Sequence, residues 1–447
     1  MKFIPHTPED KRLMLEKIGV KNIDELFASI PAELKIKQEL KLPAPLSEPE
    51  VLAELNRLAE KNTPTDNLTC FAGAGAYDHY RPALIDHIIS RPEFYTAYTP
   101  YQAEVSQGTL QSIYEFQSLV CRLFEMDVAN ASMYDCASAL AETVHMARDI
   151  TGRQSVLISE TVNPVYIEVI KTYAHGLNVP VKSIKNTNFL TDIDNLKQGL
   201  NQETSAVIVQ HPNFFGYLEP VSLIARLAHE AGALLIVAVD PISLGIIQPP
   251  GGYDADIAVA EGQSLGIPLA FGGPYLGILT AKKKYIRNMP GRIAARTVDR
   301  NGQTGYVLAL QTREQHIRRE RATSNICTNQ TLCALAATLY LAWMGRTGIK
   351  EVARQCLAKS HYLANQIAQL SEFKPFTQNP FFKEFVISTP IPAAEVIERG
   401  LEEKILCGVD LAQFNPDWQN LLLVAVTEQR NRAELDNYVG FLQGLFR

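Results

Sequence analysis

The stretch ALLIVAVDPISLGIIQPPGGYDADIAVAEGQSLGIPLAFGGPYLGILTAKKK, residues 233–284, decides the fold class. Six apolar residues, 234–239, run directly into Asp240, which predicts a buried parallel strand that ends in a carboxylate. In an open α/β sheet, ligands bind at the carboxyl ends of the strands. Asp240 is therefore expected at the ligand-binding edge, where it either faces a ligand or only caps the turn at Pro241.

One common partner of a strand-end aspartate is the protonated pyridine nitrogen of pyridoxal phosphate. The aspartate keeps the ring cationic, so that the ring can act as an electron sink. Such an enzyme also needs a lysine further along the chain to form a Schiff base with the cofactor. No lysine lies between Asp240 and Lys282, and Glu261-Gly262-Gln263-Ser264 stands where it would fall. We therefore expect a pyridoxal phosphate scaffold that cannot anchor the cofactor by itself, with Asp240 as a vestigial cofactor-binding residue.

The rest of the chain predicts an α/β architecture. Strand-like runs separated by helix-length amphipathic segments lie at 155–158, 179–184, 205–210, 234–239, 256–260 and 276–280. That alternation is typical of βαβ units and predicts a mainly parallel sheet with helices on both faces. We divide the chain into a helical arm (1–62), a large α/β domain (63–328), and a long connecting helix with a small α/β domain (329–447).

Composition excludes several classes of protein. The 447 residues are 46% hydrophobic and 20% charged, as in an ordinary globular enzyme. A net charge of −6 argues against nucleic acid as a partner, and no apolar run reaches the roughly 18 residues of a membrane span. The seven cysteines form no C-x-x-C pair, which predicts reduced thiols in the cytoplasm and no metal site.

One loop is a candidate for the wall of a binding site, and a second loop is notable for its glycines. FYTAYTPYQAEVSQG, residues 94–108, interleaves aromatic rings and hydroxyls, which suits a polar ligand site, an interface, or an interior loop with satisfied hydroxyls. CFAGAGAYDHYRP, residues 70–82, holds Gly73 and Gly75 but lacks the third glycine of a dinucleotide fingerprint. We interpret these glycines as positions where the backbone passes close to another part of the protein.

Two further segments are expected beside the ligand edge. MYDCASALAE, residues 133–142, begins a helix with Asp135 or Ser138 as N-cap, and it lacks the glycines typical of a phosphate cup. HPNFFGYLE, residues 211–219, follows a predicted strand, so Phe214 and Phe215 are expected to give that edge an apolar surface.

Residues 282–321 carry eleven Lys or Arg residues against three acidic residues. A solvated basic face is the default interpretation. Arginines that contact a small anionic substrate, or that attract an acidic partner, remain the alternative.

Several long segments together resemble the glycine decarboxylase (P-protein) family of the glycine cleavage system, and within it the amino-terminal-half subunit of two-chain forms. The segments that carry the resemblance are TAYTPYQAEVSQG (96–108), MYDCASALAE (133–142), QHPNFFGYLE (210–219), EGQSLGIPLAFGGPYLG (261–277), PGRIAARTVDRNG (290–302) and LQTREQHIRRERATSNICTNQTLCAL (310–335).

The resemblance implies a type I pyridoxal-phosphate-dependent transferase (aspartate aminotransferase-like) fold. It also implies a homologous partner subunit, in a heterodimer or heterotetramer, that holds pyridoxal phosphate on its own lysine. Gln263 then stands in the lysine position, and Phe214-Phe215 replaces a Thr-His pair of the partner half. Both substitutions follow the family's pattern for this half, so no residue of this chain is expected to be catalytic on its own.

The family reaction decarboxylates glycine and transfers the aminomethyl group to the lipoyl arm of H-protein. We expect this chain to line the partner's pocket. The candidate lining residues are Tyr98, Thr99, Tyr101, Gln102, Gly272 and Gly273, with Arg318 and Arg319 as candidate contacts to a carboxylate.

Two other functions stay open at this point. The chain could be a non-catalytic scaffold or regulator that only retains the fold. It could also be a free-standing pyridoxal phosphate enzyme that uses Lys282, Lys283 or Lys284, although that triplet follows a strand and is expected to face solvent.

Overall fold

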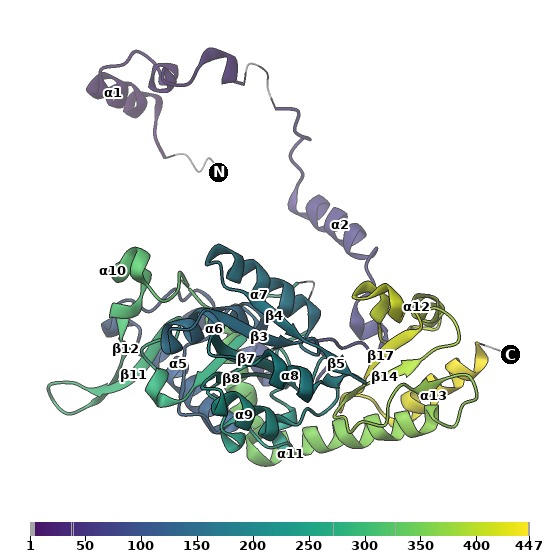
Figure 1. Cartoon of the computed structure of the whole chain (residues 1–447). Helices are drawn as coiled ribbons and strands as arrows, with labels where there is room; N and C mark the ends of the chain where they lie inside the picture. The colour runs from purple at the N-terminus through teal and green to yellow at the C-terminus, as the bar shows by residue number, and fades with distance from the viewer. Residues whose placement is uncertain (1–4, 37, 39, 271, 327, 446–447) are drawn as a thin grey trace. The chain divides into compact units, whose positions relative to one another are not determined.

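The computed structural model describes residues 5–36, 38, 40–270, 272–326 and 328–445. The chain forms two compact units, Met1–Thr63 and Pro64–Arg447, which are taken separately here (Figure 1). The predicted boundary between a large and a small domain, at residue 329, stays a prediction.

The first unit contains two capped α-helices, α1 (Pro8–Ile18) and α2 (Glu48–Ala59). Thr7 and Asp10 form a capping box at the start of α1, and Ser47 and Glu50 form another at the start of α2. None of the described residues of this unit is buried within it. The apolar side chains of its helices therefore form no core of their own.

A seven-stranded sheet forms the centre of the second unit, in the order β2-β10-β9-β8-β7-β3-β4. The run from β9 to β4 is parallel, and β10 is antiparallel to both of its neighbours. The strands are β2 (Val128–Ala129), β3 (Ser155–Ser159), β4 (Val181–Ile184), β7 (Thr204–His211), β8 (Leu234–Val239), β9 (Ile257–Glu261) and β10 (Gly277–Ala281). The predicted mainly parallel α/β sheet is confirmed.

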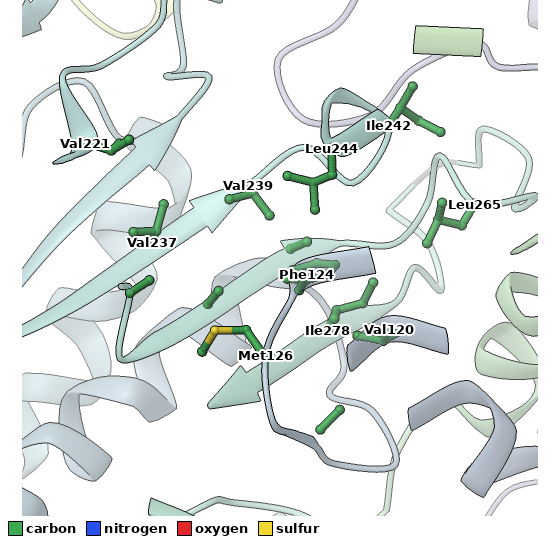
Figure 2. Packing of buried hydrophobic residues seen from close by; sticks show 14 of the residues in the cluster. Val120, Phe124, Met126, Val221, Val237, Val239, Ile242, Leu244, Leu265 and Ile278 are labelled. Atoms are coloured by element: carbon green, nitrogen blue, oxygen red, sulfur yellow. The ribbon is translucent and has the colours of Figure 1, made fainter. Parts of the chain in front are cut away.

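Alternate residues of β8 enter two different cores, which explains why the strand is apolar throughout. Val237 and Val239 pack into a cluster that includes Val120 and Phe124 of α5 (Figure 2). Ile236, on the opposite face, packs into a second cluster against α6 and α7. The helices around the sheet are α5 (Gln107–Phe124), α6 (Cys136–Thr151), α7 (Pro164–Gly176), α8 (Ile193–Gly199) and α9 (Val221–Glu230).

Shorter elements complete this part of the chain. The basic stretch contains an antiparallel hairpin, β11 (Ile293–Val298) paired with β12 (Thr304–Ala309). The others are α3 (Ala83–Ile89), α4 (Pro92–Tyr95), α10 (Gln315–Arg318), the pair β5 (Asn186–Thr187) and β6 (Leu190–Thr191), and the pair β1 (Thr69–Cys70) and β15 (Ile405–Leu406).

A smaller antiparallel sheet follows, in the order β13-β14-β17-β16. Its strands are β13 (Lys374–Pro375), β14 (Glu384–Ser388), β16 (Val409–Asp410) and β17 (Leu421–Ala425). Helices α12 (Ala393–Glu402) and α13 (Arg432–Gly444) accompany it, and Phe385 of β14 and Tyr438 of α13 share one buried cluster.

The long helix α11 (Thr331–Ile367) connects the two sheets. This helix contains one non-helical residue, Gly345 (φ 57°). Among the described helices, α11 is long and apolar enough to cross a membrane by length and composition. It contributes Ala336, Tyr340 and Leu341 to the same buried cluster as Phe124, so its apolar content is explained by packing inside the protein.

Candidate functional site

Asp240 directly follows β8, and the residues around it enclose a small cavity at the carboxyl edge of the sheet. Its walls come from the 75–77 loop, the ends of β8 and β9, and the start of β14. The polar side chains that line it include Tyr77, Tyr166, Asp240, Glu261, Lys383 and Glu384. The edge predicted to hold a ligand is therefore lined mainly by residues that can form ion pairs and hydrogen bonds with one another.

Asp240 is paired with a lysine of its own chain. The Nζ atom of Lys383 lies 2.6 Å from Oδ2 of Asp240, and the two side chains are only 2% and 12% exposed. The other oxygen of Asp240 accepts a hydrogen bond from the Ile242 N–H at 3.0 Å. Asp240 thus caps its turn, which was one of the two interpretations of this residue. It also binds a cation, but that cation is a lysine of its own chain and not a ligand.

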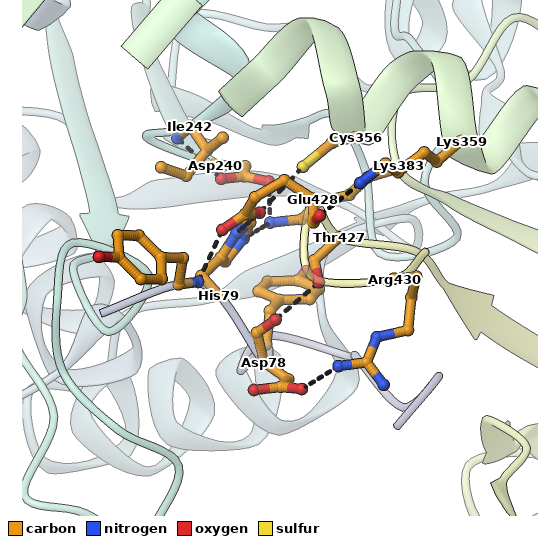
Figure 3. A network of polar contacts seen from close by, with 12 residues as sticks. Asp78, His79, Asp240, Ile242, Cys356, Lys359, Lys383, Thr427, Glu428 and Arg430 are labelled. Carbon is orange, nitrogen blue, oxygen red and sulfur yellow. Dashed lines mark hydrogen bonds and ion pairs between the residues drawn. The ribbon is translucent and has the colours of Figure 1, made fainter. Parts of the chain in front are cut away.

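Lys383 belongs to a larger polar network (Figure 3). Its ammonium lies 2.9 Å from Nε2 of His79 and 3.5 Å from the centre of the Tyr77 ring. Because an ammonium only donates, Nε2 of His79 must accept, which places the imidazole proton on Nδ1. Nδ1 lies 2.6 Å from Glu428, so that proton is donated to the carboxylate.

Glu428 is the acidic end of this network. Its carboxylate also accepts from the Tyr80 N–H at 2.6 Å and from the Cys356 thiol at 3.5 Å. Burial by itself would raise the pKa of Glu428, but the hydrogen bonds from His79 and from the Tyr80 N–H act against burial and lower the pKa from its ordinary value. The network therefore links the 77–80 loop, α11, β14 and the segment after β17 to the end of β8.

The donor atoms of His79, Cys356 and Glu428 lie within 4.8 Å of one another, a spacing that a metal ion could use. Hydrogen bonds among the three account for their positions, and Lys383 adds a positive charge on the other imidazole nitrogen. We therefore assign this cluster to hydrogen bonding.

Gln263, in the predicted lysine position, is 1% exposed and fully engaged. Its side-chain oxygen accepts from the Tyr77 N–H at 2.8 Å, and its amide nitrogen donates to the carbonyls of Tyr77 and Ile267. The amide thus fixes the backbone of the 77–80 loop against the loop after β9. At the position where a Schiff-base lysine would stand, Gln263 therefore has a structural role.

The start of α6 is already occupied by acidic side chains. Asp135 caps the helix and forms a capping box with Ser138, which confirms the predicted N-cap. Glu261 accepts a hydrogen bond from the N–H of Cys136, the first residue of α6, and others from the N–H groups of Leu276 and Gln263. A phosphate group at this helix end would meet two carboxyl groups in place of free N–H donors.

The residues of this cavity do not fit pyridoxal phosphate. Asp240 already holds Lys383, Gln263 offers no amine, and Glu261 occupies the helix end that would hold the phosphate. The cavity is also small, because the volume open to the centres of water molecules is about 30 Å³. That volume holds a few waters but not an aromatic cofactor. No chemical step is therefore assigned to the cofactor in this cavity.

The glycines in the 70–82 loop permit a close backbone approach, as predicted. A Cβ atom on Gly73 would lie 2.2 Å from Oε1 of Glu384, and one on Gly216 would lie 2.0 Å from the Glu384 carbonyl oxygen. Glu384 accepts from the Ala74 N–H and the Tyr77 hydroxyl, both at 2.7 Å, and burial raises its pKa to about 7.

The expectation for Phe214 and Phe215 was wrong. Their side chains are 2% and 0% exposed and pack in a buried cluster with Phe189 and Tyr217. The ring of Phe215 stacks on Phe189 at 3.9 Å. The two rings are buried against residues of the small sheet and do not face the ligand edge. A strand followed by a turn does not reveal such long-range packing.

The tyrosine-rich loop presents its side chains outward. Tyr98 and Tyr101 are 78% and 57% exposed, Gln102 is exposed, and Thr99 is half-buried. Tyr101 is held from behind by Arg292, whose Nη2 donates to its hydroxyl at 3.1 Å. This loop is therefore a surface and not the interior loop that was the alternative.

Comparisons with known proteins identify the family of this chain. Residues 1–442 match the family described as glycine cleavage system P-protein. The chain belongs to the P-protein family. A relative from Desulforamulus reducens, named "Probable glycine dehydrogenase (decarboxylating) subunit 1", is 54% identical over 437 residues and 98% of each chain. One of the same name from Chlorobium phaeobacteroides is also 54% identical, over 100% of each chain.

Solved structures show the same fold. A crystal structure described as glycine decarboxylase (P-protein) of the glycine cleavage system, in inhibitor-bound form, is 41% identical over 100% of both chains, with a TM-score of 0.90. A sphingosine-1-phosphate lyase from Burkholderia pseudomallei is 13% identical over 93% of each chain, with a TM-score of 0.66. This P-protein chain has the type I pyridoxal-phosphate-dependent transferase fold.

The remaining site candidates of the P-protein chain lie in exposed segments. Gly272 and Gly273 have φ angles of +72° and +97° in the turn before β10, and a Cβ on Gly272 would meet nothing within 4 Å. Arg318 and Arg319 are exposed and have no ion-pair partner in the described ranges. Arg318 lies with Arg287, Arg313 and Arg321 around one surface cavity, apart from the Asp240 network.

Several residues that shape the site were not singled out from the sequence. They are Tyr77, His79, Arg292, Cys356, Lys383, Glu384 and Glu428. For Lys383 and Glu384 a signal was present, since FFKEFVIS places two adjacent charges in an otherwise apolar strand segment. Buried charges need partners, so that pair pointed to a network. The other five have no local pattern that marks them.

Lys283 and Lys284 are exposed, as expected of the triplet. Lys282 is only partly exposed and forms ion pairs with Asp254 and Asp256. The Nζ atom of Lys282 lies 2.8 Å from Oδ1 of Asp254 and 2.9 Å from Oδ1 of Asp256. None of the three lysines lines the Asp240 cavity.

Proposed function

We propose that this chain is subunit 1 of a glycine dehydrogenase (decarboxylating) and acts only with a homologous, lysine-bearing subunit. The observation that carries the proposal is the closed pocket, in which Lys383 pairs with Asp240 and Gln263 stands in the lysine position. A P-protein half built in this way needs a second polypeptide to hold the cofactor.

In this proposal, pyridoxal phosphate is bound to a lysine of the partner subunit, in a cytoplasmic heterodimer or heterotetramer. Glycine is decarboxylated at that site, and the aminomethyl group passes to the lipoyl arm of H-protein. This chain supplies part of the wall of the pocket through Tyr98, Thr99, Tyr101, Gln102 and the Gly272-Gly273 turn.

The exposure of the tyrosine-rich segment supports an interface there. Tyr95, Tyr98, Tyr101 and Val105 are 57–80% exposed within ten residues of one another along the chain. A cluster of large side chains on a surface is typical of a site that another molecule covers. Tyrosine is also enriched where a protein surface must be both apolar and able to form hydrogen bonds.

The amino-terminal arm supports the same view. Leu13 and Ile18 of α1 and Leu52 and Leu55 of α2 are 50–60% exposed within their own unit. Two well-capped amphipathic helices with no core of their own require another apolar surface. We propose that the arm packs on a neighbouring subunit.

Reconstitution tests the proposed function. The purified chain, its lysine-bearing homologue and an equimolar mixture are assayed for glycine–bicarbonate exchange in the presence of lipoylated H-protein. We expect activity only in the mixture, and no aldimine absorbance from this chain incubated with pyridoxal phosphate. Full activity of the homologue alone would remove this chain from the enzyme.

A second measurement separates an active wall from a passive scaffold. In the assembled complex, Gln102→Ala removes one side chain of the proposed wall, and the exposed helix residue Arg226→Gln serves as the control. A loss of exchange activity confined to Gln102→Ala supports the wall. Equal activity of Gln102→Ala, Tyr98→Phe and wild type would favour the scaffold.

A further inference from the structure

We propose that Arg292 is a positioning residue that aims the hydroxyl of Tyr101 at an anionic oxygen in the partner's pocket. The anionic oxygen belongs either to the carboxylate of glycine or to the phosphate of the cofactor. The inference rests on the proposed function and adds to it a residue outside the lining set derived from the sequence.

Arg292 is set firmly in the fold at the start of the β11–β12 hairpin. Its carbonyl oxygen accepts from the Ala131 N–H at 2.7 Å, and its side chain is 7% exposed. A second arginine fixes the residues before it, since Arg313 donates to the carbonyls of Met289 and Gly291. The guanidinium of Arg292 therefore has little freedom to move.

Arg292 determines the orientation of the Tyr101 hydroxyl proton. Its Nη2 lies 3.1 Å from the Tyr101 oxygen, and its guanidinium carbon lies 5.2 Å from the centre of the ring. A guanidinium can only donate, so the tyrosine oxygen must accept, and the phenolic proton is left for another acceptor. Because Tyr101 is 57% exposed, that acceptor can come from outside this chain.

The surroundings of Arg292 are incompletely paired. Its Nε is buried and has no hydrogen-bond partner among the described residues. The carboxylate of Glu314 comes no closer than 3.8 Å, and Oε1 of Glu314 likewise has no hydrogen-bond partner in the described chain. The charge of Arg292 is offset by the Glu314 carboxylate, so the preference for an anion comes from the Tyr101 hydroxyl itself. A hydroxyl that accepts a hydrogen bond from a guanidinium donates its own proton more strongly, and a charged acceptor gains most from that.

Arg292 is a better-supported arginine for this role than Arg318 or Arg319. Those two are exposed and, in the described part of the chain, contact none of the tyrosines of the 94–108 loop through a hydrogen bond or a ring contact. Arg292 is buried, rigid and joined to Tyr101 by both a hydrogen bond and a cation–π contact.

The test uses the complex of this chain with its lysine-bearing homologue. The variants are Tyr101→Phe, Arg292→Gln, the double variant and Arg292→Lys, with Arg226→Gln as the matched surface control. For each complex, KM for glycine, kcat and the affinity for pyridoxal phosphate are measured, and size-exclusion chromatography checks assembly.

We expect Tyr101→Phe and Arg292→Gln to weaken the same binding step by about ten- to a hundredfold, the usual effect of losing a hydrogen bond to a charged group. If the acceptor is the glycine carboxylate, KM rises while cofactor affinity is unchanged. If the acceptor is the cofactor phosphate, cofactor affinity falls. In the Tyr101→Phe background, Arg292→Gln should add less than about threefold, because Arg292 acts through Tyr101.

Other outcomes overturn the inference. Equal and multiplicative effects of the two single variants would show that Arg292 acts independently of Tyr101. If activity requires this chain and yet Tyr101→Phe matches wild type in all three quantities, the inference fails and the proposed function stands. If Arg292→Gln does not assemble, the comparison of Tyr101→Phe with Arg292→Lys tests the inference. Tyr101→Phe keeps the aromatic ring, and Arg292→Lys keeps the positive charge.

Discussion

The ammonium of Lys383 lies 2.6 Å from the carboxylate of Asp240, and this pair joins the end of β8 to the start of the small sheet. In a pyridoxal phosphate enzyme, a strand-end aspartate faces the ring nitrogen of the cofactor. Here the positive partner is a side chain of the same polypeptide. The Lys383 ammonium therefore serves as the cationic partner of Asp240, and the ion pair holds two parts of the fold together.

Removing Lys383 should destabilise the chain strongly. Lys383→Met keeps the length of the side chain but leaves Asp240 buried without its cation. Breaking a buried ion pair on one side costs about 3–5 kcal/mol, because the remaining charge is uncompensated. The expected result is a large fall in the thermal unfolding midpoint of the isolated chain, measured by circular dichroism.

The double variant Asp240→Asn/Lys383→Met is the control for this interpretation. It removes both charges, so its loss of stability should be smaller than that of Lys383→Met alone. If the double variant loses as much stability as Asp240→Asn and Lys383→Met lose together, the result would contradict a direct pairing of Asp240 with Lys383.

Glu384 should make stability depend on pH. Burial raises its pKa from the ordinary value of 4.5 to about 7 in the folded chain. Between these two pH values the unfolded chain releases the proton and the folded chain retains it, so this residue makes unfolding easier as pH rises. The contribution amounts to about 3 kcal/mol over the window and levels off above pH 7.

Glu384→Gln removes this titration and keeps an acceptor for the Ala74 N–H and a partner for the Tyr77 hydroxyl. Relative to wild type, the variant should gain stability steadily from pH 4.5 to pH 7 and no further above that. Urea unfolding of both proteins at matched pH values measures the difference. A difference that does not change with pH would show that Glu384 does not titrate in this window.

Much of the fold could be predicted because its determinants are local. The continuous apolar run of β8 indicates a strand buried on both faces, and Val237 and Ile236 do enter opposite cores. The predicted cap of α6 is equally local, since the capping box of Asp135 needs only Ser138, three positions away.

The site was harder to predict because its contacts are made between distant segments. Lys383 meets Asp240 and His79, and Arg292 meets Tyr101, across long stretches of chain that no periodicity relates. The assignment of Gln263 to the lysine position came from the family resemblance. The structure adds the reason why an amide suits this position, which is its bridge between the Tyr77 and Ile267 backbones.

Gly216 should tolerate substitution far less well than Gly302. Both have positive φ angles, +89° and +79°, so alanine pays about 1 kcal/mol at either position for its backbone conformation. Only at Gly216 would the new Cβ clash, at 2.0 Å from the Glu384 carbonyl oxygen, whereas Gly302 has nothing within 4 Å. Including the clash, Gly216→Ala should lose about 2–4 kcal/mol. Thermal melts of the two variants compare these losses, and equal losses would contradict the close contact.

Restoring a lysine at position 263 should not restore cofactor binding. Gln263→Lys supplies an amine, but it also leaves the Tyr77 N–H without its acceptor, at a cost of about 1–3 kcal/mol. Lys383 still occupies Asp240, and Glu261 still accepts from the first N–H of α6. The variant incubated with pyridoxal phosphate should therefore show no aldimine absorbance and a lower melting temperature.

Adding Lys383→Met to Gln263→Lys separates the two obstacles to the cofactor. The double variant frees Asp240 but keeps the Glu261 carboxyl group where a phosphate would bind. Burial raises the pKa of Glu261 to about 8, so its charge, and with it the repulsion of phosphate, increases as pH rises towards that value. Any aldimine signal in the double variant should therefore be weaker at pH 9 than at pH 6.5. An aldimine band in Gln263→Lys alone would mean that Lys383 does not close the pocket.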